Sequence, residues 1–152
     1  MSIQVKTHIS VAVIFLWIGF FCAISFMEAW LKFQAPDVTL AIGLGIGRLV
    51  FGALNKIEWI FALIVLILIV GKETRFKWEN LLFLIVLAIL IIQTSLLLPA
   101  LDARAESLIN GHNVPASNLH FYYVGMEVVK ALCLVIFGVK QSGILKASSN
   151  KL

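Results

Sequence analysis

The sequence predicts an all-α fold: an integral membrane four-helix bundle, antiparallel in up-down-up-down order. Of its 152 residues, 61% are hydrophobic and only 13% are charged, about half the roughly 25% that is typical of soluble domains. The hydrophobic residues form four blocks, and about 20 apolar residues in a helix span a hydrocarbon core of about 30 Å. The blocks occupy nearly the whole chain, which leaves no room for a separate soluble domain.

The predicted helices are separated by short polar segments. We expect helices at about 9–33, 39–70, 80–100 and 118–139. Pro36 and Asp37 mark the first turn, and charged residues fill 71–79. An outer loop over 102–117 and a polar cytoplasmic tail over 140–152 complete a single transmembrane domain.

The first apolar block is predicted to be a retained helix and not a cleaved signal. It runs from Ile9 to about Met27, which is longer than the roughly 7–15 apolar residues of a secretory signal. It ends in Glu28-Ala-Trp-Leu-Lys32 instead of a small-residue cleavage site.

The distribution of Lys and Arg predicts that both termini are cytoplasmic, because basic residues concentrate in cytoplasmic segments. The side with Lys32 and Arg104 carries two basic residues and would face outward. The localisation expected is a multi-pass protein of the plasma membrane, here a bacterial inner membrane. The net charge of +4 belongs to helix ends that meet lipid headgroups, so nucleic-acid binding is not expected. The other side carries seven basic residues: Lys6, Lys72, Arg75, Lys77, Lys140, Lys146 and Lys151.

Polar residues within the predicted helices gather in the outer half of the bundle. On the fourth helix they are spaced three, four and three apart, which places them in one stripe. A charge inside the membrane costs about 2.5–3.5 kcal/mol or more, so it should face the bundle and find a partner. Lys130 is the expected partner of Glu127, and Lys130, Arg48 or Asn55 that of Glu58. The candidate ligand-binding residues are Arg48, Asn55, Glu58, Gln93, Asp102, His120, Tyr123, Glu127 and Lys130.

Two interpretations of this polar layer stay open. It could bind a ligand, proton or substrate, since ionisable residues inside a membrane are functional candidates by default. It could equally hold the helices together through hydrogen bonds worth about 0.6–2 kcal/mol each. No catalytic set, metal site or cofactor is predicted. Cys22 and Cys133 lie in apolar runs without a CxxC motif, and are expected to be buried small hydrophobic residues.

Glycines occur near the start of the second helix. Gly43 and Gly47 are four apart with Gly45 between them, a GxxxG spacing that allows close approach of helices. This face could serve packing within the chain or contact with a second copy in a homo-oligomer.

The first turn and second helix resemble a known family. The stretch Phe33-Gln-Ala-Pro36, followed by the segment from Gly43 to Glu58, is similar to four-helix bacterial membrane proteins of unknown function. That family is related to a eukaryotic transmembrane protein linked to drug resistance. Pro99 and His120 match the proline after its third helix and the histidine near the start of its fourth. The resemblance implies a membrane bundle and no established chemistry.

A second resemblance is to the glutathione-using membrane enzymes of eicosanoid and detoxification metabolism. Arg48 and Asn55-Lys-Ile-Glu58 fit their Arg…Asn-x-x-Glu signature. Phe51 lies where a second arginine is expected between Arg48 and Asn55, and the family's late third-helix motif is missing.

These observations predict a small polytopic protein with an outward-facing polar site inside the membrane, in a binding, transport or assembly role. The alternatives are a glutathione-dependent membrane transferase and a structural subunit of a membrane complex. An enzyme is the less expected class. The lipid bilayer is the expected partner.

Overall fold

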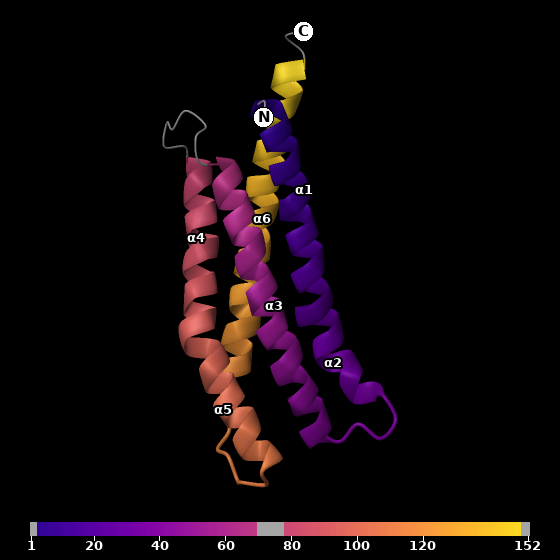
Figure 1. Ribbon diagram of the computed structural model, residues 1–152. Helices are drawn as coiled ribbons and strands as arrows, with labels where there is room; N and C mark the ends of the chain where they lie inside the picture. The colour runs from indigo at the N-terminus through magenta and orange to yellow at the C-terminus, as the bar shows by residue number, and fades with distance from the viewer. Residues whose placement is uncertain (1–2, 70–77, 150–152) are drawn as a thin grey trace.

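The computed structural model describes residues 3–69 and 78–149, which form an antiparallel bundle of four helical spans and no strand. Both termini lie at one end of the bundle, here called the terminal end (Figure 1). The connections at 35–39 and 110–118 lie at the other, the loop end. The first span consists of α1 (Ile3–Cys22), a π turn (Ala23–Glu28), α2 (Ala29–Leu31) and a 3-10 turn (Lys32–Gln34). The second span is α3 (Leu40–Ile69), and the fourth is α6 (Leu119–Ser149). The third span consists of α4 (Trp78–Ile92), a π turn (Gln93–Leu97) and α5 (Leu98–Ile109).

All four spans are long and apolar enough to cross a membrane. The outer surface of the bundle is hydrophobic, with exposed fractions of 62% for Leu16, 78% for Leu49 and 73% for Phe121. A set of polar and charged side chains within the spans is buried instead, including Glu58 and Lys130. Apolar side chains outside and polar ones inside suit a hydrocarbon solvent. The predicted fold class is therefore confirmed, and the chain is a multi-pass membrane protein.

Three of the spans extend beyond their predicted bounds. The first begins at Ile3 instead of residue 9, and α6 continues to Ser149 through the segment predicted as a polar tail from residue 140. A helix satisfies its own backbone hydrogen bonds, so it does not have to end where the apolar residues end. Residues 70–77, which contain most of the predicted charged connection, and 150–152 lie outside the described residues.

The third span also runs past the predicted end at residue 100. Pro99 lies in the first turn of α5, directly after the π turn Gln93–Leu97. A proline inside a regular helix lacks an N–H donor and clashes with the carbonyl four residues earlier. The wider π turn, in which the Leu98 N–H bonds to the Gln93 carbonyl, changes this register and lets the chain stay helical. The sequence beyond it, with three Ala, three Leu, one Arg and one Glu in Leu98–Ile109, favours helix.

The third span ends at Ile109 in a Schellman motif. The Gly111 N–H bonds to the Leu108 carbonyl, and the His112 N–H to the Ser107 carbonyl. Gly111 has φ of 79°, a left-handed conformation that glycine adopts without strain. The predicted outer loop over 102–117 is consequently shorter, covering only 110–118.

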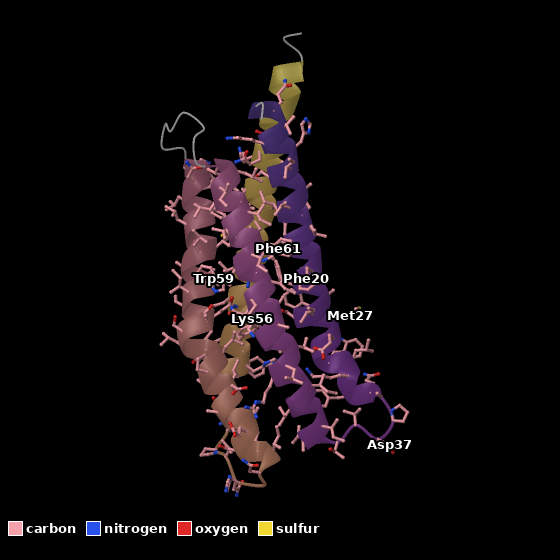
Figure 2. The ribbon with its side chains drawn as sticks, viewed as in Figure 1. Phe20, Met27, Asp37, Lys56, Trp59 and Phe61 are labelled. Carbon is pink, nitrogen blue, oxygen red and sulfur yellow. The ribbon has the colours of Figure 1, made fainter. Side chains whose placement is uncertain are left out.

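Packing divides the bundle into layers along its axis. The half toward the terminal end holds an apolar core in which Phe83 of α4 stacks on Phe137 of α6 with ring centroids 5.5 Å apart. Phe20 of α1 meets Phe61 of α3 edge to face at 6.2 Å, and both are labelled in Figure 2. Lipid tails are as apolar as these residues, so this core is held by van der Waals packing. Three buried polar side chains, Thr7, Ser10 and Gln141, also lie in this half, whereas the buried charged residues lie nearer the middle of the bundle.

The face of α3 that carries Gly43 and Gly47 packs against another segment of the same chain. A Cβ atom on Gly43 would lie 2.1 Å from the Phe33 ring, and one on Gly47 would lie 2.9 Å from the Lys32 Nζ. A Cβ on Gly45 would meet nothing within 4 Å. Gly43 and Gly47 therefore allow the end of the first span to approach α3 closely. A homo-oligomer through this face stays a prediction.

Candidate functional site

Lys130 of α6 lies at the centre of a fully buried group of polar side chains, here called the buried cluster: Glu58, Gln93, Glu127 and Lys130. Its Nζ lies 2.6 Å from Glu58 Oε1 on α3 and 2.9 Å from Glu127 Oε1, one turn earlier on α6. All three side chains have zero exposed surface. Lys130 thus neutralises carboxylates of two helices from within the bundle.

Two neutral residues complete the hydrogen bonding of these charges. Gln93, in the π turn of the third span, accepts from Lys130 Nζ at 2.9 Å and donates to Glu127 Oε1 at 2.9 Å. Trp17 of α1 donates its indole N–H to Glu58 Oε1 at 3.0 Å. The Phe21 ring lies 5.2 Å from Lys130 Nζ, within the range of a cation–π contact. All four spans therefore meet at this cluster.

The charges in the cluster do not balance. Two carboxylates face one ammonium, and the second oxygen of each carboxylate, Oε2, is buried without a hydrogen-bond partner among the described residues. Removing a carboxylate from water costs several kcal/mol unless it is neutralised and hydrogen-bonded. With both carboxylates ionised, the cluster is one positive charge short of neutrality.

A cavity of about 710 Å³ lies between the cluster and the loop end, a volume in the range of small-molecule sites. Its walls come from α2, α3, α5 and α6 and from the adjoining turns. Figure 1 shows α2 and α5 on opposite sides of α3 at this end. The charged side chains in the lining are Lys32, Arg48, Lys56 and Asp102, and much of the remaining lining is apolar, including Phe33, Phe51 and Leu98.

Most polar groups of the lining are already paired. Arg48 forms two parallel bonds to Asp102, 2.5 Å from Nε to Oδ1 and 2.9 Å from Nη2 to Oδ2, and a third contact to Glu106 at 3.3 Å. Lys32 pairs with Glu28 at 3.3 Å.

Asn55 is also engaged, since it donates to Thr94 Oγ1 at 3.0 Å. Lys56, labelled on α3 in Figure 2, is exposed and forms no ion pair within the part of the chain that the structure describes. It is the lining cation that is available to a ligand.

The structure separates the nine predicted site residues into two groups. Four of them form the buried cluster, and the predicted pairs of Lys130 with Glu127 and with Glu58 are both present. The other predicted partners of Glu58 are engaged elsewhere, Arg48 with Asp102 and Asn55 with Thr94. The residues that line the cavity are Arg48, Asn55, Asp102, His120 and Tyr123.

Tyr123 joins the two groups. It lines the cavity, although only 2% of its surface is exposed. It lies one turn before Glu127 on α6, and its hydroxyl interacts electrostatically with the Glu127 carboxylate. The hydroxyl has no partner at hydrogen-bond geometry among the described residues. Phe51 holds the ring edge to face at 5.4 Å.

The three residues that resemble the glutathione-enzyme signature do not share one surface. Arg48 and Asn55 line the cavity, whereas Glu58 has zero exposure and is bound by Trp17 and Lys130. A peptide thiol in the cavity would meet only two of them.

Sequence reasoning missed Trp17, Thr94 and Lys56. Tryptophans of membrane helices concentrate at the interfaces, so a tryptophan in the middle of a span indicates a buried partner for its N–H. Thr94 has no such signal, because it connects Asn55 with the Trp59 indole only through tertiary packing. Lys56 has no signal as a ligand-binding residue either, because only the tertiary structure shows that it lines the cavity without an ion pair in the described residues.

The fold and the two polar groups define a class, a multi-pass membrane bundle with a buried charge cluster beside a cavity. Comparisons with protein-family models, with curated proteins and with solved structures found no match to this chain.

Proposed function

We propose that the protein binds an anionic amphiphile in its loop-end cavity, with a carboxylate or phosphate head at Lys56 and an apolar tail along the aromatic and aliphatic wall. The single observation that carries this is the charge of the lining: three basic side chains, one acidic side chain and an otherwise largely apolar wall. Lys56 lies near the middle of α3, and a lysine without a counter-charge at such a depth is costly. An anionic ligand would supply that counter-charge.

We place the cavity on the outer side of a bacterial inner membrane, with both termini in the cytoplasm. Seven basic residues on the terminal side against two on the loop side support this orientation. The protein would then bind, or carry, an amphiphile from the outer leaflet.

The test is native mass spectrometry of the protein released from nanodiscs with four probes at equal concentration: decanoate, decyl phosphate, decanol and decylammonium. We expect adducts with the two anions and much less with the neutral and cationic probes. Lys56→Gln should weaken anion binding by about tenfold, the value of one charged hydrogen bond. The matched control Lys140→Gln, exposed on α6 away from the cavity lining, should bind like the wild type.

Equal binding of decylammonium, or an unchanged affinity of Lys56→Gln, would exclude an anion site. Reduced glutathione serves as a further probe. A glutathione adduct abolished by Arg48→Ala would favour the transferase alternative instead. We expect no such adduct, because Glu58 is not accessible from the cavity.

A further inference from the structure

We propose that the buried cluster binds one proton, held on a carboxyl of Glu58 or Glu127, and exchanges it with the loop-end cavity through Tyr123. With both carboxylates ionised, the cluster carries one uncompensated negative charge inside a hydrocarbon environment, which is costly. Addition of H⁺ to one carboxylate gives a carboxylic acid and leaves a neutral group. This inference concerns the ligand-free protein and does not depend on amphiphile binding.

The geometry leaves a place for that proton. Glu58 and Glu127 both contact Lys130 through Oε1, at 2.6 Å and 2.9 Å, and the Oε2 atom of each is buried without a hydrogen-bond partner in the described part of the chain. The described residues contain no group of three or more His, Cys, Asp or Glu side chains that could hold a metal ion. A proton needs only one oxygen, and the Oε2 atoms are not used by Lys130.

Neighbouring groups do not change the charge count. The Cys22 thiol of the first span and the Tyr123 hydroxyl of α6 interact electrostatically with Glu127, and both groups are uncharged in water at neutral pH. Trp17 and Gln93 are neutral donors. Lys56, two residues before Glu58 on α3, is exposed and forms no ion pair with it.

Tyr123 provides the connection to the cavity. Its side chain lines the cavity while its hydroxyl is buried one turn from Glu127. A hydroxyl both donates and accepts a proton, so it can pass one between the carboxyl and a water molecule or ligand head in the cavity. Its edge-to-face contact with Phe51 positions the ring for this transfer.

The experiment is infrared spectroscopy of the ligand-free protein in nanodiscs at neutral pH, following the C=O band of protonated carboxyls and its shift in D₂O. We expect one such band in the wild type and its loss in both Glu58→Gln and Glu127→Gln, because one carboxylate and one ammonium already balance. The control is Glu28→Gln, whose carboxylate is already paired one to one with Lys32; it should keep the band. Lys130→Met should about double the band area, since two carboxyls then need protons.

A wild type without the band, or a band that survives both Gln substitutions in the cluster, would overturn the proposal. If the wild type lacks the band and its melting temperature rises in NaCl but not in KCl, the cluster holds a sodium ion instead of a proton, and the proposal is likewise wrong. The Tyr123→Phe variant keeps the ring and should retain the band. In this variant the shift of the band after transfer to D₂O should be several-fold slower than in the wild type. Exchange at the wild-type rate would rule out the route through Tyr123.

Discussion

The ammonium of Lys130 on α6 lies 2.6 Å from the carboxylate of Glu58 on α3, and neither side chain has any exposed surface. The contact joins two spans at the middle of the bundle. The same ammonium also binds Glu127. One cation therefore neutralises part of the charge of two helices, and both the stability and the proton content of the protein depend on it.

Lys130→Met removes this shared cation. We expect the free energy of unfolding to fall by up to about 3–5 kcal/mol, because the two carboxylates lose their shared cation and must take up protons to stay buried. The control Lys56→Met removes an exposed lysine that forms no ion pair among the described residues. Because such a charge inside a membrane is costly, stability should stay the same or rise. Thermal or denaturant unfolding in detergent measures both. Equal stabilities of the two variants would show that the buried pairs contribute nothing.

Replacing the cluster residues with leucine distinguishes the stabilisation that the ion pairs provide from the cost of burying a charge without a partner. Glu127→Leu with Lys130→Leu leaves the Glu58 carboxylate without its cation and should destabilise the bundle strongly. Adding Glu58→Leu removes that last charge, leaving only neutral donors unsatisfied at about 1–3 kcal/mol each. We expect the triple variant to be more stable than the double variant in the same unfolding experiment, although it carries one more substitution. The reverse order would mean that Glu58 does not need Lys130.

Gly43 and Gly45 differ in what a methyl group would meet. Gly43→Ala places a Cβ against the Phe33 ring, so we expect a loss of about 1–3 kcal/mol from overpacking. Gly45→Ala enters open space and should be neutral or stabilising by up to about 1 kcal/mol through helix propensity. Melting temperatures of the two variants test this directly. A Gly43→Ala variant as stable as Gly45→Ala would show that Phe33 moves aside freely.

The orientation in the membrane is testable with single cysteines. In a chain with Cys22 and Cys133 replaced by alanine, Asn113→Cys lies in the exposed 110–118 connection and Gly143→Cys lies exposed near the terminal end. An impermeant maleimide should label Asn113→Cys in intact spheroplasts, and Gly143→Cys only after lysis. The opposite pattern would place both termini outside and the cavity on the cytoplasmic side.

The sequence by itself determined the number of spans and the stripe of polar residues on the fourth one. Backbone groups in hydrocarbon must bond within the segment, so apolar runs of sufficient length become helices whatever their neighbours are. The fourth span is regular from Leu119 onward, so the stripe of Tyr123, Glu127 and Lys130 followed from residue spacing alone.

Only the tertiary structure decided which partners those residues have. The third span contains a π turn at Gln93–Leu97, and one extra residue rotates the following helix face by about 100°. Spacing therefore cannot relate Gln93, which lies in the cluster, to Asp102, which pairs with Arg48 at the cavity. The choice of Trp17 for Glu58, and the separation of the buried cluster from the cavity, depend on how four helices rotate and pack against each other. No single helix encodes that rotation, because it minimises the energy of all the contacts at once.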